Sequence, residues 1–455
     1  MTKLDWTPWH QVVELRDDLK SGELSLSIFA ADLYDVVMGR AKPVYQDADE
    51  FFALTYPTFN LRELSKDVAL RLANKNDKAV RQLTLTYGGG KTHALILLYH
   101  LFKDGGKLPD VASVREIRNH IGIDMPRARV AVLAFDKIDV ESGMDIVGPD
   151  GSQRRLRQPW SILAYQIAGD EGLKILHPDG KAEERNSAPA EPLLADVLRI
   201  PLQQKLPTLI LIDEVLMYAR EKVRLDKGAA DTLTNFFQYL TQAATKIDGC
   251  TLVASLLASD PAKNDSIGKQ LTADFHTIFR REQEEGVQPV TKEDVPEVLR
   301  RRFFKPHSIE KPELFREHVV AALEGIANLD EQTARDRKAA EDRFVNSYPF
   351  HPDLTEVLYS KWTALEGFQR TRGVLRTFSL ALRSACKWDT APLISAGVFL
   401  GAPSQAVISE AATELISVAG AEEYEGKTQN WRAILEGEIE KARHVQEEFS
   451  SLKHR

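Results

Sequence analysis

Short apolar runs alternate with helical segments through the middle of the chain, and this alternation constrains the fold most. We expect five strands, with the last the weakest in pattern: residues 82–87, 129–135, 208–213, 251–256 and 286–291. Runs of Val, Leu and Ile without polar alternation are typical of strands buried on both faces. Strands that alternate with helices form parallel sheets that helices cover on both sides. The sequence therefore predicts an α/β fold built on a parallel sheet.

The chain divides into four predicted parts, because its 455 residues exceed what one hydrophobic core usually serves. A helical region over 1–75 precedes an α/β core over 76–292, in which 140–195 is a loop-rich insertion. A helical lid region over 293–400 and a polar helical extension over 401–455 follow. The extension stops in a charged run without a capping signal, so we expect an N-terminal fragment of a longer protein.

Composition excludes several classes of protein. No apolar run reaches the roughly eighteen residues of a membrane-spanning helix, and the start of the chain lacks a secretory signal. The only cysteines, Cys250 and Cys386, cannot form a disulfide framework or a four-ligand zinc site, and they suit a reducing compartment. We expect a cytoplasmic protein without a membrane partner. A formal net charge of −8 argues against a globally basic nucleic-acid binder, and the basic runs at 154–157 and 300–302 are interpreted as solvated faces.

A glycine-rich segment joins the first strand to an apolar helix. It contains three glycines, a lysine and a threonine, namely Gly88, Gly89, Gly90, Lys91 and Thr92. Glycines let successive backbone N–H groups point at phosphate oxygens, and the following helix presents its positive end to the same anion. Lys91 would reach the β- and γ-phosphates, and the Thr92 hydroxyl would ligate Mg²⁺. ATP and Mg²⁺ are therefore the expected ligands.

The segment departs from the usual pattern G-x-x-x-x-G-K-[ST] at one position, because Leu85 stands where the leading glycine is expected. That glycine serves the entry turn of the loop rather than phosphate contact. The departure weakens the match without removing the phosphate cradle. A glycine-rich turn that only caps a helix is the alternative interpretation of the loop taken alone.

The third predicted strand ends in two adjacent carboxylates, Asp213 and Glu214. Asp213 is placed to hold the Mg²⁺ shell, usually through water, and Glu214 is placed to orient and deprotonate the attacking water. A buried strand that ends in a solvated acidic turn is the alternative interpretation of this motif alone. The loop and the strand together predict a P-loop ATPase that hydrolyses ATP.

These residues resemble the AAA+ superfamily of ATPases. More narrowly, the chain is similar to a prokaryotic family of large predicted ATPases encoded beside DNA methyltransferases and helicases in anti-phage or restriction-like loci, related to the ATPases of the phage-exclusion (BREX) systems. The match runs from about Trp9 to residue 400, and the segments that carry it are 83–93, 209–214, 298–303, 348–352 and 368–376. The loop of that family also ends in Gly-Gly-Gly-Lys-Thr-His, which adds His93 to the cofactor-binding residues. Its members run well past 455 residues, which supports a fragment.

The resemblance implies an ASCE/AAA+ sheet with strand order 5-1-4-3-2 and nucleotide at its carboxyl edge. The fourth strand, 251–256, would then lie between the loop strand and the Asp-Glu strand. A polar residue at its end would touch the γ-phosphate or the attacking water. Ser255 is the first choice and Ser259 the alternative, while a buried serine bonded only to backbone is the competing interpretation.

Arginines matter because the transition state spreads negative charge over the γ-phosphoryl oxygens. Arg280 and Arg281 precede the fifth predicted strand, where a guanidinium would reach the nucleotide of a neighbouring subunit. The competing interpretation is an ion pair with one of three nearby acids, Glu282, Glu284 or Glu285. In the C-terminal region, Arg376 would point back at the phosphates from the first turn of a helix, with Arg372 as the alternative.

Two classes of function remain open from the sequence. The first, which the resemblance implies, is a motor or switch ATPase in a nucleic-acid-associated anti-phage defence complex. Its candidate partners are further copies of the chain and DNA or DNA-modifying proteins. The second is a nucleotide-gated scaffold that binds ATP to recruit partners with little turnover. Glu214 favours the first, because a pure binder needs no base, whereas net acidity and the lack of a DNA-reading motif favour the second.

Overall fold

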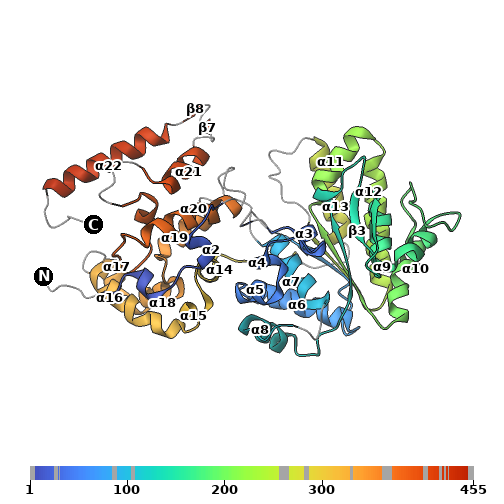
Figure 1. Cartoon of the computed structure of the whole chain (residues 1–455), viewed down its shortest axis with the longest axis horizontal. Coiled ribbons are helices and arrows are strands. Elements are labelled where there is room, and N and C mark those ends of the chain that lie inside the picture. The colour runs from blue at the N-terminus through green and yellow to red at the C-terminus, as the bar shows by residue number, and fades with distance from the viewer. Residues whose placement is uncertain are drawn as a thin grey trace. The chain divides into compact units, whose positions relative to one another are not determined.

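A computed structural model describes most of the chain (Figure 1). The chain divides into two compact units. The described residues are 6–24, 29, 31–84, 90–103, 108–255, 266–280, 286–327, 331–360, 371–402, 408–419, 423–424, 427–428 and 430–448. Unit 1 comprises Met1–Ala30, Leu54–Tyr56 and Thr291–Arg455, and unit 2 comprises Ala31–Ala53 and Pro57–Val290. The first 75 residues are thus divided between the units. Every helix in the described part of the chain is too short or too polar to span a bilayer.

A four-stranded parallel sheet forms the centre of unit 2. Its strands are β1 (Val80–Leu83), β2 (Arg129–Ala134), β5 (Thr208–Asp213) and β6 (Cys250–Ser255). Their spatial order is β1-β6-β5-β2, and every neighbouring pair is parallel. Strands β5 and β6 are buried at every residue, which explains their unbroken apolar sequences. The prediction of an α/β fold on a parallel sheet is confirmed.

The order of these four strands agrees with the 1-4-3-2 part of the predicted order. The fifth predicted strand, 286–291, is wrong as a strand, because only Val287 forms a parallel bridge with β1, at Leu83. The bridge consists of hydrogen bonds from Thr84 N to Val287 O and from Val287 N to Gln82 O, both 2.9 Å long. Pro289 follows two residues later, and its missing N–H explains why the ladder stops.

Helices cover both sides of the sheet in unit 2. One side carries α6 (Phe59–Leu72), α7 (Lys91–Lys103) and α8 (Ala112–Ile121), and the other carries α9 (Pro159–Leu176), α10 (Glu191–Gln203), α12 (Ala229–Lys246) and α13 (Ser266–Arg280) (Figure 1). Helix α7 is buried on all sides from Ala94 to Phe102, which is typical of a helix enclosed within a core.

The remaining elements of unit 2 surround this sheet. They are α3 (Leu33–Val37), α4 (Pro43–Gln46), α5 (Ala48–Ala53), the short helix η2 (Phe135–Lys137), the antiparallel hairpin β3 (Met144–Val147) and β4 (Gln153–Leu156), and α11 (Val215–Leu225). The hairpin and α9 lie within the predicted insertion between β2 and β5. In the basic run 154–157, Arg154 pairs with Asp170 and Arg155 with Asp145.

Unit 1 is mainly helical. Its described elements are α1 (Trp9–Val12), α2 (Asp17–Lys20), α14 (Val295–Phe303), α15 (Pro306–Ile309), η3 (Pro312–Leu314), α16 (Phe315–Ala327), α17 (Glu331–Arg335), α18 (Arg337–Ser347), α19 (Pro352–Ser360), α20 (Thr371–Ala385), η6 (Ala396–Phe399), α21 (Glu410–Ala419), the hairpin β7 (Glu423–Tyr424) and β8 (Lys427–Thr428), and α22 (Trp431–Glu448). Its core gathers aromatic rings, among them Phe303 stacked on Phe378 with centroids 5.7 Å apart.

The interpretation of the basic run 300–302 as a solvated face is wrong for Arg300. This side chain is buried and donates to the backbone oxygens of Tyr348 and Asn346 at 2.6 and 2.7 Å. Arg301 donates to Glu297 Oε1 at 2.9 Å. Arg300 can be buried in α14 because these bonds replace the water that its guanidinium loses.

Candidate functional site

The phosphate-loop candidates and the acidic strand meet at the carboxyl edge of the sheet. Thr92 Oγ1, in the first turn of α7, donates to Asp213 Oδ2, at the end of β5, over 2.9 Å. Strand β6 separates β1 from β5, so this contact requires α7 to cross over β6, and α7 does contact both β5 and β6. The two residues predicted to hold Mg²⁺ are therefore in direct contact.

Gly90 is the last glycine of the loop and the only one of the three within the described residues; Gly88 and Gly89 lie outside them. Its φ of +103° belongs to a region that residues with a Cβ rarely adopt. A Cβ at this position would also lie 3.3 Å from Val290 Cγ2. Gly90 O accepts the backbone N–H of Ala94 at 2.7 Å, which begins the hydrogen-bonding of α7. The positive φ favours glycine here, and the close approach of Val290 leaves little room for a Cβ.

Lys91 is a partly buried cation without an ion pair or hydrogen bond in the described part of the chain. Burial lowers the pKa of its ammonium group, and the charges of Asp213 and Glu214 oppose that shift without removing it. A desolvated cation at the start of α7 is therefore placed to receive an anion, because an incoming phosphate would supply the partner that the chain does not.

Among the residues that the structure describes, Asp213 and Ser255 each hold a buried oxygen for which no hydrogen-bond partner is found. Asp213 is 4% exposed and Ser255 fully buried, and the two are register partners in neighbouring strands. Asp213 Oδ1 and Ser255 Oγ form no hydrogen bond, although the serine hydroxyl lies near enough to lower the pKa of the carboxyl group. An unsatisfied buried polar atom costs about 1–3 kcal/mol. Both atoms lie at the same strand edge, where an incoming ligand would offer them further hydrogen bonds.

The pKa of Asp213 is raised to about 7, first by burial and then by the negative charge of Glu214. The hydroxyls of Ser255 and Thr92 and the charge of Lys91 act in the opposite direction. A divalent cation would reverse this balance, because it favours the ionised carboxylate.

The donor set fits Mg²⁺ rather than a softer metal. Asp213 and Thr92 offer a carboxylate and a hydroxyl oxygen, and Mg²⁺ characteristically uses one or two carboxylates together with waters and substrate phosphates. Within the described ranges, no group of three or more His, Cys, Asp or Glu side chains gathers as a metal cage. Mg²⁺ at this edge would thus depend on phosphate oxygens for part of its shell.

Glu214 has an unusual backbone conformation. Its φ of +54° and ψ of +44° place a non-glycine residue in the left-handed region, directly before α11. Such a residue costs about 1–3 kcal/mol and persists where the surrounding structure over-determines it, often at functional sites. The sequence carries no signal for this strain, because glutamate is not a residue that favours positive φ.

The other sequence candidates are placed as follows. The ring of His93 packs against Phe51 with centroids 4.5 Å apart. Arg376 belongs to unit 1, where its guanidinium pairs with Glu414 and donates to the backbone oxygen of Leu24. Arg280 ends α13 and Arg372 lies in α20, but the structure describes neither side chain. Arg281 and Ser259 lie outside the described residues.

The fold and the site define an α/β protein whose parallel sheet carries a Gly-Lys-Thr segment beside the buried Asp213 and the partly exposed Glu214. Two family models match the chain, the DUF499 N-terminal domain over residues 9–275 and the DUF499 second domain over residues 290–394. The chain belongs to the DUF499 family. Comparison with curated proteins and with solved structures gives no match. The second matched domain begins at residue 290, which is also the last residue of unit 2.

Asp213→Asn should remove a pH-dependent component of stability. The pKa of about 7 in the folded chain exceeds the ordinary 3.8 of the unfolded chain, so stability from the protonated carboxyl is lost as pH rises between these values. At about 1.4 kcal/mol per pKa unit, we expect Asp213→Asn to gain on the order of 2–4 kcal/mol over wild type between pH 4.5 and 7.5. Urea unfolding of both proteins in EDTA measures this difference. An advantage of equal size at both pH values would contradict the assigned burial.

Proposed function

We propose that this chain is a Mg²⁺-dependent ATPase of the P-loop ASCE/AAA+ type. The observation that carries the proposal is the hydrogen bond from Thr92 to Asp213, formed across the intervening strand β6. It joins the end of a glycine-rich loop to a buried carboxylate, and beside them lies Lys91, which has no ion pair within the described ranges. A loop that merely caps a helix needs neither this contact nor an unpaired buried cation.

Each residue has a defined role in this proposal. The backbone N–H groups of the loop bind phosphate oxygens, and Lys91 neutralises charge on the β- and γ-phosphates. Thr92 and Asp213 would hold Mg²⁺, which when bound polarises the phosphoryl oxygens. Glu214 orients a water and accepts its proton as the water oxygen bonds to the γ-phosphorus and the bond to ADP breaks. Ser255 donates its unpartnered hydroxyl to the γ-phosphate or the attacking water.

The resemblance to large ATPases of anti-phage loci extends this proposal to a motor or switch in a defence complex with DNA or DNA-modifying proteins. A nucleotide-gated scaffold with little turnover is the second candidate, and one observation favours it. Arginines of the basic runs have partners within the chain: Arg155 pairs with Asp145 and Arg157 with Glu184 at the surface, and Arg300 is buried. The charges of Arg155 and Arg157 are therefore partly offset by acidic neighbours, and Arg300 is out of reach of a DNA phosphate.

Steady-state phosphate release with and without duplex DNA distinguishes the candidates. A motor or switch ATPase should release phosphate only with Mg²⁺, and duplex DNA should increase the rate. A protein that binds Mg·ATP with defined stoichiometry but releases no phosphate in either condition would be a scaffold, and the hydrolytic role of Glu214 would be withdrawn.

A further inference from the structure

Residues 286–290 run alongside the strand that leads into the phosphate loop. Val287 bridges β1 through two backbone hydrogen bonds of 2.9 Å. A Cβ at Gly286 would overlap the side chain of Thr84, the residue that follows β1, so the segment lies close to this end of the strand. Gln288 Nε2 donates to Val290 O at 3.1 Å and braces the segment internally. We call residues 286–290 the strap.

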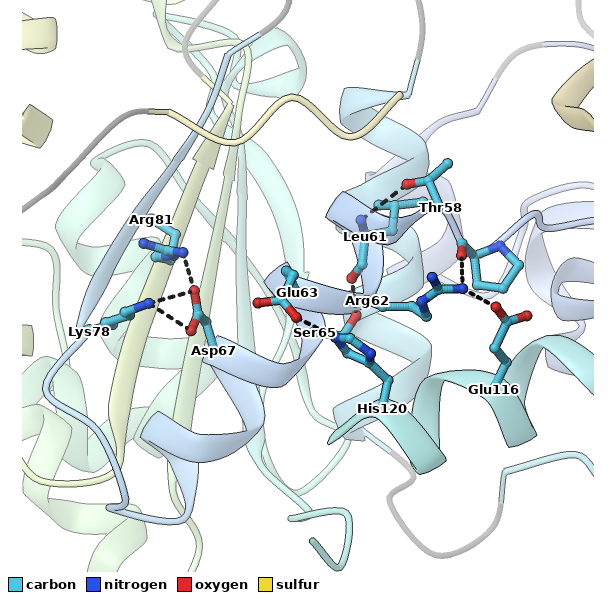
Figure 2. A network of polar contacts seen from close by, with 11 residues as sticks. Thr58, Leu61, Arg62, Glu63, Ser65, Asp67, Lys78, Arg81, Glu116 and His120 are labelled. Carbon is cyan, nitrogen blue, oxygen red and sulfur yellow. Dashed lines mark hydrogen bonds and ion pairs between the residues drawn. The ribbon is translucent and has the colours of Figure 1, made fainter. Parts of the chain in front are cut away.

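The strap is also bonded to the start of α6 by two side chains. Thr58 Oγ1 donates to Pro289 O at 2.5 Å, and Asn60 Nδ2 donates to Gln288 O at 2.8 Å. Thr58 has a second role, because its hydroxyl accepts the N–H of Leu61 and caps α6 (Figure 2). Pro289 is buried, whereas the other residues of the strap are partly or fully exposed. The two hydrogen bonds therefore hold Pro289 in its buried position.

Helix α6 is itself fixed to the chain that enters β1. Asp67 receives Lys78 Nζ at 3.0 Å and pairs with the buried Arg81 of β1 (Figure 2). An ion pair buried between a helix and a strand is costly to break by removing one partner. Helix α6 therefore provides a rigid support from which Thr58 and Asn60 hold the strap.

The far end of the strap lies against the phosphate loop. Val290 Cγ2 is 3.3 Å from the position that a Cβ of Gly90 would occupy, and Pro289 Cβ is 3.8 Å from it. The strap thus packs on the one described loop glycine whose positive φ is needed for the cradle.

We propose that closure of the strap and anion binding by the phosphate loop are linked equilibria. This inference rests on the proposed function, because it requires a phosphate ligand at residues 90–92. A bound triphosphate fixes the Gly90 backbone and so stabilises the surface on which Val290 packs. Release of the strap removes that support. Because the two equilibria are linked, the free energy by which the ligand stabilises the closed strap equals the free energy by which strap closure stabilises ligand binding. Asn60 is on this account a positioning residue, since it acts through the strap without touching the ligand.

Asn60 allows a clean test. Asn60→Asp keeps the shape of the side chain, removes the donor to Gln288 O, and adds a charge that favours the N-terminus of α6. Asn60→Leu removes the donor without adding charge. Both variants should speed backbone hydrogen exchange over 286–290 in the ligand-free full chain and weaken Mg·ATP binding by about 5- to 150-fold, the usual range of coupling. Asn119→Asp, on the exposed face of α8, is the charge-matched control and should match wild type in both measurements.

Thr58 gives the conservative pair. Thr58→Ser retains both the cap and the donor and should bind like wild type. Thr58→Asp keeps the cap acceptor but cannot donate to Pro289 O, so it should behave as Asn60→Leu does. In wild type, Mg·ATP should slow exchange over 286–290.

The outcomes separate this inference from the proposed function. If wild type binds Mg·ATP but exchange over 286–290 stays unchanged, linkage is refuted while the ATP site stands. If Asn60→Asp alone weakens binding, the effect is one of charge, and the strap has no role. If wild type binds no Mg·ATP in calorimetry, the proposed function and the linkage both fall, even where exchange shows a closed strap.

Discussion

Lys91→Ala should weaken Mg·ATP binding severely or abolish it while leaving the fold intact. The ammonium group is partly buried and has no partner in the described part of the chain, so a bound triphosphate would be its main source of compensation. Truncating one member of a desolvated, hydrogen-bonded charge pair costs about 2–5 kcal/mol, which weakens binding roughly 30-fold to several thousand-fold. Isothermal calorimetry with Mg·ATP measures the effect.

The unfolding midpoint of Lys91→Ala should be no lower than that of wild type. Burial lowers the pKa of Lys91, which means that the folded state disfavours the charge, and its removal should not destabilise the chain. Lys103→Ala, at the exposed end of the same helix, is the matched control and should bind Mg·ATP normally. Wild-type ATP affinity in Lys91→Ala would overturn the assignment of the loop.

Glu214→Gln should separate binding from chemistry. Gln keeps the size of the side chain and removes the proton acceptor, so ATP should still bind while turnover falls by about 10²-fold or more, the usual worth of a general base. Single-turnover phosphate release measures the chemical step directly. Glu221→Gln, on the exposed surface of α11, the helix that follows Glu214, controls for the lost charge. Hydrolysis at the wild-type rate in Glu214→Gln would assign the base to another residue.

The strained backbone of Glu214 adds a second readout. Glu214→Gly relieves a φ of +54° and should raise the free energy of unfolding by about 1 kcal/mol while eliminating turnover. A variant that gains stability and loses activity marks strain held at a functional position. The same variant without any gain in stability would show that the surrounding structure, rather than the residue, sets the conformation.

Local patterns in the sequence predicted much of the fold of unit 2. The unbroken apolar runs predicted β2, β5 and β6, because strands buried on both faces need no polar alternation. Strand type, and the order of the four strands implied by the resemblance, were confirmed. The fifth strand was mistaken because the run 286–291 holds Pro289, which cannot continue a ladder.

Features set by long-range contact could not be predicted in the same way. Arg300 looks solvated in sequence, yet α14 turns it toward the backbone of Tyr348, 48 residues later. The bond from Thr58 to Pro289 spans 231 residues and has no local signal beyond a helix cap. The sequence predicted only that Thr92 and Asp213 would bind the same Mg²⁺. The direct hydrogen bond between them depends on α7 crossing over β6, which is a long-range feature of the fold.

A calorimetric titration of the wild-type chain with ATP, in the presence of Mg²⁺ and then in EDTA, tests directly whether the chain binds Mg·ATP at the carboxyl edge of the sheet. Thr92, Asp213 and Lys91 form one phosphate and metal site in this account, so we expect one ATP bound per chain, with much weaker binding once Mg²⁺ is removed. Binding with Mg²⁺ should also release protons at pH 7, because a cation converts Asp213, with its pKa of about 7, to the carboxylate. A flat titration in both conditions, from a chain that is folded by circular dichroism, would contradict the account.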